Sequence, residues 1–205
     1  MITLYRAPHS TNVERVALAL AHKGLEVESV TIDYADRGLV EAVSGQGLVP
    51  VVVDDGHVVA DSAAILRYLE DRYPDRPLYP GDPARRAEMD VFIEWFNEVW
   101  KVPPNAIELE LDEVAPDRAR IAALGARMAG WLAVFEAMLD GRDHLMGDDL
   151  TAADCIAYPF LKYTAGIDAA DDERFHRILA EHQPLGEDHP RLAGWIEGMA
   201  RRPQV

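Results

Sequence analysis

The first part of the chain alternates between β-prone runs and a segment with helical spacing. Residues 2–6 form a short β-prone run. Within residues 13–20 the apolar positions recur at the interval of a helix, which we expect to end at Lys23, with Gly24 as its cap. Residues 27–33 alternate between apolar and polar positions and predict a second strand. The order strand, helix, strand predicts that these two strands are parallel.

A β-hairpin and a second helix complete the predicted first domain. Residues 34–48 are polar and contain glycine, so we expect a loop there. Two β-branched runs follow, and the Asp55-Gly56 pair between them is a strong signal for a two-residue hairpin turn. Ser62 then opens a segment with helical spacing that ends before Pro74.

A proline-rich stretch divides the chain. Residues 74–83 contain four prolines, a composition typical of a stiff linker. We therefore expect an α/β domain over residues 1–76, a linker over 77–84 and an all-helical domain over 85–205. The segments with helical spacing after the linker are 84–100, 117–140, 151–164, 172–182 and 190–201.

Composition and charge narrow the classes of function. The formal net charge of -16 argues against binding of nucleic acid, which requires clustered lysine and arginine. The single cysteine, Cys155, rules out an internal disulfide, and no cluster of cysteine and histidine has metal-ligand spacing. No stretch resembles a membrane span or an export signal, so we expect a cytoplasmic protein that binds no membrane.

Two short motifs are candidates for ligand binding, and each also has a purely structural interpretation. Val49-Pro50 lies directly before a predicted strand, where a proline is tolerated whether or not it has a special role. Asp61-Ser62 lies at the start of a helix, whose free N–H groups favour a bound carboxylate. Ser62 is equally suited to act as the N-cap of that helix.

In this order and on this topology, the motifs resemble the glutathione transferase superfamily, and the resemblance covers essentially the whole chain. It implies a thioredoxin-like N-terminal domain followed by an all-helical C-terminal domain. In that family a valine before a cis-proline pairs with the cysteinyl part of glutathione, and Val49 and Pro50 match. An acidic residue and a serine hold the γ-glutamyl end, and Asp61 and Ser62 match. The family's Asn-Pro that often precedes the valine-proline motif is absent here, whereas the glycine, Gly47, is kept.

The helical half of the chain carries an independent match to the same family. Thr151 and Asp154 have the spacing of a capping box, and Leu150 and Cys155 have the spacing of a hydrophobic staple. The family carries this pair of motifs at the buried helix of its second domain. We therefore interpret Cys155 as a packing residue rather than a nucleophile.

Two hydroxyl groups are candidates for stabilising the thiolate of glutathione. The family's serine-type members place their active residue at the position of Ser10, and its tyrosine-type members place theirs at the position of Tyr5. We favour Ser10, because Thr11 and Glu14 have the spacing of a capping box that would leave the Ser10 hydroxyl available above a helix N-terminus. The absence of cysteine at position 10 argues against disulfide exchange.

Other residues complete the predicted site. Arg37 is a candidate for the glycine carboxylate of glutathione, and Gln46 for a further contact, although an exposed loop arginine is usually a surface charge. We expect the second-substrate site on the first long helix of the second domain, where an aromatic stripe also suits a core. This stripe contains Phe92, Trp95, Phe96 and Trp100. Pro103-Pro104 is expected to bend or interrupt that helix.

The resemblance implies a glutathione transferase that joins the thiolate of glutathione to a small hydrophobic electrophile. Glutathione would be a co-substrate, with no tightly bound cofactor and no metal, and the enzyme would be a homodimer. Isomerisation, dehalogenation and glutathione-dependent reduction remain open as alternative reactions on the same scaffold. A non-catalytic binding or regulatory role also remains open, as does a low-molecular-weight thiol other than glutathione.

Overall fold

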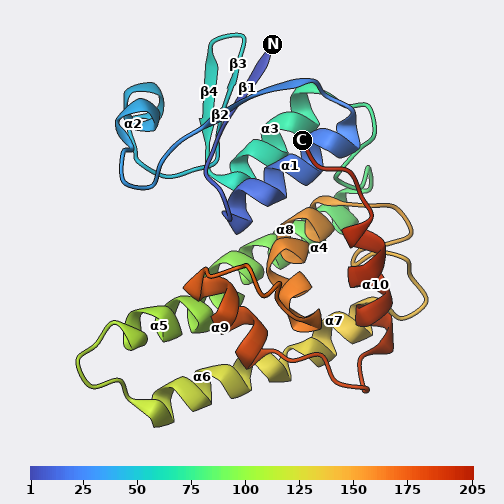
Figure 1. Ribbon diagram of the computed structural model, residues 1–205. Coiled ribbons are helices and arrows are strands. Elements are labelled where there is room, and N and C mark those ends of the chain that lie inside the picture. Colours follow the sequence, from blue (N-terminus) through green and yellow to red (C-terminus); the bar gives the residue numbers. More distant parts are fainter. The chain divides into compact units, whose positions relative to one another are not determined.

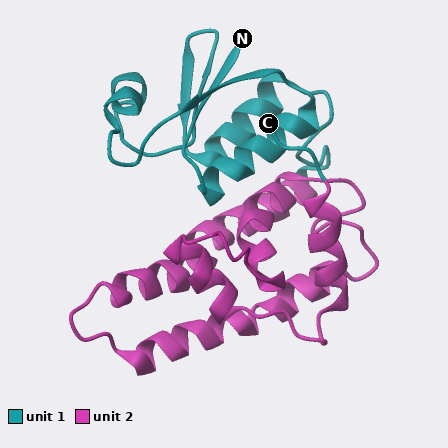
Figure 2. Ribbon diagram, viewed as in Figure 1, with its two compact units in different colours: residues 1–83, 202–205 teal, residues 84–201 magenta.

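The computed structural model describes residues 1–205 and divides into two compact units (Figure 2). Unit 1 comprises Met1–Pro83 together with Arg202–Val205, and unit 2 comprises Ala84–Arg201. We expected all of the C-terminal residues in the helical domain. The last four instead belong to unit 1, where the Arg6 guanidinium donates to the Val205 carbonyl at 2.7 Å.

Unit 1 is built on a four-stranded mixed sheet in the order β2-β1-β3-β4. Strand β1 pairs in parallel with β2, and β3 pairs antiparallel with β4, as the sequence predicts. Strand β3 also pairs antiparallel with β1, which the sequence did not indicate. The predicted turn is also confirmed, since Asp55 and Gly56 both have positive φ angles, 47° and 85°. The four strands are β1 (Ile2–Arg6), β2 (Val27–Thr31), β3 (Val51–Asp54) and β4 (His57–Ala60).

Helices lie on both faces of this sheet. α1 (Thr11–Lys23) and α3 (Ser62–Arg72) lie side by side on one face, and α2 (Gly38–Ser44) lies on the other (Figure 1). Side chains alternate across the sheet accordingly, because successive residues of a strand point to opposite faces. Leu4 and Val52 pair across β1 and β3 and are fully buried, whereas the preceding residue of β3, Val51, packs in a separate cluster with residues of α2.

The sequence did not predict α2, because residues 34–48 were expected to form a loop. This helix has only seven residues, and Val40 is its single buried residue. A segment this short gives no repeated apolar spacing by which a helix could be recognised in the sequence. Gly38 begins the helix and Gly45 caps it with a φ of 75°. The structure therefore has the strand and helix order β-α-β-α-β-β-α, which is the thioredoxin-like arrangement expected for the first domain.

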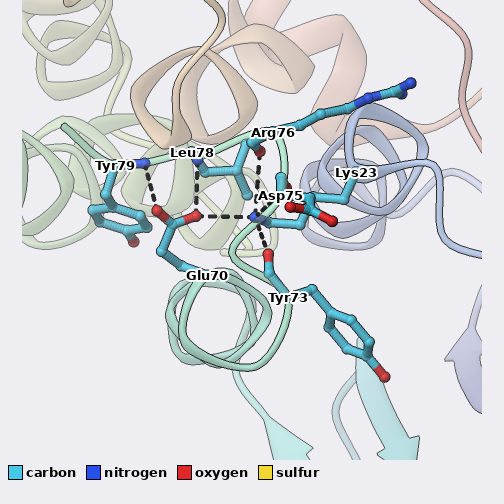
Figure 3. A network of polar contacts seen from close by, with 7 residues as sticks. All are labelled: Lys23, Glu70, Tyr73, Asp75, Arg76, Leu78 and Tyr79. Atoms are coloured by element: carbon cyan, nitrogen blue, oxygen red, sulfur yellow. Dashed lines mark hydrogen bonds and ion pairs between the residues drawn. The ribbon is translucent and has the colours of Figure 1, made fainter. Parts of the chain in front are cut away.

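A buried ion pair ties α1 and α3 to the chain that follows them (Figure 3). The Lys23 Nζ atom donates to Glu70 Oε2 at 3.0 Å and to the Tyr73 carbonyl at 2.7 Å. The Glu70 carboxylate accepts in turn from the backbone N–H groups of Leu78 and Tyr79, at 2.8 and 3.4 Å. Burial of an ion pair is tolerated only when further hydrogen bonds satisfy both charges, and this network supplies them.

Unit 2 is entirely helical, as predicted. Its elements are α4 (Pro83–Trp95), a π-helical turn (Phe96–Trp100), α5 (Val102–Leu111), α6 (Arg118–Gly130), α7 (Leu132–Met138), α8 (Ala152–Leu161), a 3-10 turn (Lys162–Ala165), α9 (Arg174–His182) and α10 (Pro190–Ala200). The Pro103-Pro104 pair lies in the first turn of α5, so the expected interruption is the start of a new helix. A missing N–H group is harmless in a first helical turn.

The core of unit 2 surrounds α8, in which every residue is buried. The predicted capping box is present between Thr151 and Asp154. The fully buried Asp154 carboxylate also accepts hydrogen bonds from the backbone N–H of Leu145 and from Trp195 Nε1, each at 2.9 Å. Cys155 is completely buried, in agreement with its predicted role as a packing residue.

One stretch of unit 2, Arg118–Met138, is apolar enough and long enough to cross a membrane when judged by length and composition alone. In the structure this stretch consists of two helices, α6 and α7, with a break at Trp131. α6 packs against α5 and α9. In the structure the first helix of this stretch therefore packs against other helices of unit 2.

We predict that Glu70→Ala destabilises unit 1 by about 3–5 kcal/mol, because it leaves the buried Lys23 ammonium without its carboxylate partner. Urea unfolding monitored by circular dichroism measures this change. The matched control is Asp71→Ala, which removes an exposed carboxylate from the same helix and is expected to change stability by less than about 0.5 kcal/mol. Equal losses for the two variants would contradict a structural role for the network.

Candidate functional site

The register of the sheet brings the predicted binding segments to one edge of unit 1. Tyr5 of β1 pairs with Val51 of β3, and Val51 pairs with Ala60 of β4. The end of β1, the start of β3 and the end of β4 therefore meet at this edge. Each of the three candidate segments, at Ser10, Val49-Pro50 and Asp61-Ser62, follows or precedes one of these strand ends by a few residues.

Ser10 lies at the N-terminus of α1 and caps it. We expected Thr11 and Glu14 to form the cap and to leave Ser10 out of it, and this prediction was wrong. The helix begins at Thr11, Ser10 has extended backbone angles, and its Oγ accepts a long hydrogen bond of 3.3 Å from the Val13 N–H. The sequence contains two overlapping candidates for the cap one residue apart, and a periodicity argument does not separate them.

The capping bond determines how the Ser10 hydroxyl can form further hydrogen bonds. A hydroxyl has one hydrogen to donate and two lone pairs to accept with, and the Val13 N–H occupies a lone pair. The hydroxyl hydrogen remains available for an anion near the positive end of the helix dipole. The cap and a thiolate-stabilising role are therefore compatible in the same side chain.

Tyr5, the competing hydroxyl, belongs to the small apolar cluster on the α2 face of the sheet. Its ring is partly buried and packs against the buried cluster of Ala7, Ile32, Val40 and Val51. This packing gives Tyr5 a structural role. Which of the two hydroxyls acts on a thiolate stays a prediction.

Val49 and Pro50 lie immediately before β3 and are joined by a cis peptide bond, as the family resemblance implies. Pro50 is buried, and Val49 is partly buried against the same apolar cluster that holds Tyr5. The main chain of Val49 is thus held at the edge of the sheet by the packing of its side chain.

Arg37 and Gln46 shape the loop that leads to Val49. The Arg37 guanidinium donates to the carbonyls of Tyr34 and Gly47, at 3.2 and 2.9 Å. The Gln46 side-chain carbonyl accepts from the Leu48 N–H at 2.6 Å, and its amide donates to the Leu48 carbonyl at 2.9 Å. Both side chains therefore support the loop from within, and their contacts with a ligand stay a prediction.

The structure shows which of Asp61 and Ser62 caps α3, a question that the sequence left open. Asp61, rather than Ser62, is the N-cap of α3, and its Oδ1 accepts from the N–H groups of Ala63 and Ala64, both at 3.0 Å. Its backbone has a φ of 74°, which is strained for a residue with a side chain, and such strain is often found at functional sites. Ser62 is the first residue of the helix and is buried.

Arg15, which no motif in the sequence singled out, lies against Ser62. Its side chain lies on α1, only 1% of it is exposed, and its Nη1 donates to Ser62 Oγ at 3.2 Å. Burial lowers the pKa of the Arg15 guanidinium to about 9, while the charge of Asp61 acts in the opposite direction. Arg15 therefore stays protonated at neutral pH. The signal in the sequence is a cation in the midst of the apolar positions of the helix, from Val13 to Leu20.

The expected second-substrate stripe forms part of the core of unit 2. Phe92, Phe96 and Trp100 are buried, and the rings of Phe96 and Trp100 stack with their centres 4.4 Å apart. Trp95 is only partly buried, and its ring is steeply inclined to that of Trp131, with the ring centres 5.6 Å apart and an angle of 77° between the planes. A pocket of about 490 Å³ in unit 2 is lined by other residues, among them Tyr158, Tyr163, Ile167, Leu185 and Ile196.

The fold of unit 1, with the cis-proline before β3 and the helix α3 that follows the hairpin, defines a thioredoxin-like domain. Comparison with known proteins identifies the family. Residues 4–77 match the model of the glutathione S-transferase N-terminal domain, and residues 118–198 match that of the C-terminal domain. The chain belongs to the glutathione S-transferase family.

Individual relatives agree with this assignment. The solved structure of a glutathione S-transferase from Rhodospirillum rubrum F11 is 30% identical, with a TM-score of 0.77 over 99% of this chain and 89% of that chain. Glutathione S-transferase GstB of Escherichia coli K12 is 28% identical over 100% of this chain and 96% of its own length. A maleylacetoacetate isomerase of Pseudomonas aeruginosa is 41% identical over 91 residues, which are 41% of this chain and 43% of the isomerase.

The two roles of Asp61, as cap and as charge, are separable by substitution. We predict that Asp61→Ala destabilises unit 1 by about 1 kcal/mol, because the bonds to the N–H groups of Ala63 and Ala64 are lost. Asp61→Asn keeps a capping oxygen and is expected to stay within about 0.5 kcal/mol of the parent protein. Thermal or urea unfolding of both variants measures the difference, and a loss of stability in the asparagine variant equal to that in the alanine variant would contradict the capping geometry.

Proposed function

We propose that this protein is a glutathione transferase in which Ser10 stabilises the thiolate of bound glutathione. The observation that carries the proposal is the hydrogen bond from the Val13 N–H to Ser10 Oγ, which leaves the serine hydrogen as a donor at the N-terminus of α1. A thiol is mostly protonated at neutral pH, and the reactive species is the thiolate. A hydrogen-bond donor beside the positive end of a helix dipole lowers the pKa of such a thiol.

The remaining candidate residues would position the peptide. The main chain of Val49 would pair with the cysteinyl residue, and the γ-glutamyl end would lie at the N-terminus of α3. There the exposed Asp61 carboxylate suits the ammonium group of the γ-glutamyl residue, and Ser62 suits its carboxylate. Fixed placement of the thiolate raises the rate of its attack on an electrophile, because it removes the entropy loss of a bimolecular encounter.

The reaction that we propose is conjugation. The thiolate sulfur forms a bond to an electrophilic carbon of a small hydrophobic substrate, and a leaving group departs with the bonding electrons or the carbon skeleton takes up a proton from water. The protein needs no bound redox group for this step, since no electrons are exchanged with a further partner. Glutathione is consumed as a co-substrate.

Substitution at Ser10 tests the proposal. We predict that Ser10→Ala lowers kcat/KM for glutathione-dependent conjugation of 1-chloro-2,4-dinitrobenzene roughly 10- to 100-fold, the worth of one hydrogen bond to a charged group. It should also cost about 1 kcal/mol of stability through the lost cap. Ser10→Gly is the matched control for the cap, because a glycine at an N-cap costs only a few tenths of a kcal/mol and has no hydroxyl for the thiolate.

The three outcomes are distinguishable. Loss of activity in both variants, with stability nearly retained in Ser10→Gly, supports the donor role. Full activity in Ser10→Gly would show that only the cap matters. Loss of activity in Tyr5→Phe, with Ser10→Ala fully active, would transfer the role to Tyr5.

Glutathione-dependent isomerisation is a second candidate. It is favoured by the identity of 41% to a maleylacetoacetate isomerase over 91 residues. The same thiolate would add to a cis double bond, allow rotation about the resulting single bond and then leave, so that glutathione is regenerated. Assays of conjugation and of maleylacetoacetate isomerisation on one preparation distinguish the two reactions, because only conjugation consumes glutathione.

A further inference from the structure

The proposed function assigns no role to the pocket of about 490 Å³ in unit 2. Its wall is formed by α8, the 3-10 turn and the loop after it, the segment before α10, and α10 itself. Every residue of this wall belongs to unit 2, whereas the candidates Ser10, Val49, Asp61 and Ser62 belong to unit 1. The volume lies in the range of sites that hold a small organic molecule, about 300–1,000 Å³.

Two aromatic rings give the pocket a preformed apolar wall. The Tyr163 ring stacks on that of His176, with the ring centres 4.4 Å apart. The Tyr158 ring is inclined at 78° to that of Trp195, with the ring centres 5.9 Å apart. Both tyrosines are more than nine-tenths buried, and aliphatic side chains from the loop and from α10 complete the lining. The pocket therefore suits the apolar part of a ligand.

The charged residues of the wall are mostly acidic. They are Asp168, Asp171 and Glu197, against one cation, Lys162. Glu197 also pairs with Arg201 on the same helix at 2.9 Å, but both side chains are largely exposed, and a pair of this kind contributes little. The wall therefore carries an excess of negative charge.

Two of the three carboxylates are fixed by their own loop. The Asp171 N–H donates to the Asp168 carbonyl at 3.0 Å, and Asp168 Oδ1 accepts from the Ala170 N–H at 2.8 Å. The Asp171 carboxylate accepts from the Glu173 N–H at 3.1 Å, and its other oxygen lies 2.8 Å from His176 Nδ1. Groups that are already ordered lose little entropy when a ligand binds.

We propose that this pocket is a binding site for an amphipathic amine, whose apolar part lies against the two tyrosine rings and whose ammonium group lies at the acidic side chains. An ammonium group is attracted both by carboxylates and by the face of an aromatic ring. A ligand with an anionic head group would instead face the excess of negative charge. The inference does not depend on the proposed function, because it concerns a ligand of unit 2 alone.

Three probes with one apolar skeleton test the preference for an amine. They are 4-phenylbutylamine, 4-phenylbutanol and 4-phenylbutyrate, and none of them carries a leaving group, so binding is measured without turnover. Nuclear magnetic resonance titration of the isotope-labelled full chain gives the dissociation constants and identifies the residues whose signals move. We expect the amine to bind roughly 5- to 20-fold more tightly than the alcohol, and the carboxylate to bind most weakly. The largest shifts should fall on Tyr158, Tyr163 and Ile196, which line the pocket.

Charge variants separate the contribution of the head group from that of the apolar part. Asp168→Asn keeps an oxygen that can accept from the Ala170 N–H, and it should weaken binding of the amine about threefold while leaving that of the alcohol within about twofold. Adding Glu197→Gln should reduce the ratio of the two dissociation constants to less than about threefold. The matched control, Asp143→Asn, removes an exposed carboxylate of unit 2 outside the pocket and should change neither constant.

A variant that fills the pocket tests its location. Ala193 is half-buried in the wall, and Ala193→Phe places a ring there that should weaken binding of both the amine and the alcohol at least about 10-fold. Ala126→Phe adds the same ring to an exposed position of α6 and should leave both constants unchanged. Circular dichroism verifies that each variant is folded.

Four outcomes would overturn the proposal: no detectable binding of the amine, equal affinities for the amine and the alcohol, shifts confined to residues outside the pocket, and unchanged binding by folded Ala193→Phe. If Ala193→Phe does not fold, the shifts in the parent protein decide the location and Asp168→Asn decides the role of charge. Failure here leaves the proposed function intact, because that function is tested by glutathione conjugation in the Ser10 variants.

Discussion

Two buried cations of α1 hold α3 beside it, and the geometry of the site depends on this pairing. Arg15 meets Ser62 and Lys23 meets Glu70, and both pairs are separated by 47 residues in the sequence. The two helices therefore run in the same direction in a fixed register. The pairs lie eight residues apart on each helix, which is about 12 Å along the axis. One pair lies at the candidate binding site, and the other lies where the chain leaves α3.

The two pairs make different electrostatic contributions. At Lys23 the charge is neutralised by Glu70 and by backbone carbonyl groups, so this end of the helix pair is a structural joint. At Arg15 the guanidinium donates to the Ser62 hydroxyl, the charge of Asp61 favours its protonated form, and the apolar packing of α1 and α3 helps to offset the cost of burying it. Leu18, Leu20, Leu66 and Leu69 are among the fully buried residues that supply this packing.

Features that depend on neighbours in the sequence were predictable. The Asp55-Gly56 turn, the αL cap at Gly24 and the capping box at Thr151 all appear as expected, because each follows from local backbone requirements. The parallel pairing of β1 with β2 and the β3-β4 hairpin were also predictable from their connections, whereas the pairing of β3 with β1, which completes the sheet, was not predicted.

Features that depend on tertiary contacts were not predictable. The helix α2 has too few buried residues to leave a period, and the partner of Arg15 lies 47 positions along the chain. The cap at Ser10 was misassigned because two capping patterns overlap there. The sequence showed that the aromatic stripe on α4 and the turn after it is apolar, but not whether its side chains face the core or a ligand. Most of them face the core.

The bond from the Val13 N–H to Ser10 has a consequence for where protons go. A hydroxyl whose lone pair is engaged and whose hydrogen faces the sulfur is a poor base, and it has no means of carrying away the proton of a bound thiol. In the proposed function that proton must pass to bulk water or buffer when glutathione binds. The site would then set the fraction of bound glutathione that is ionised at a given pH, and the solvent would set how quickly that fraction is reached.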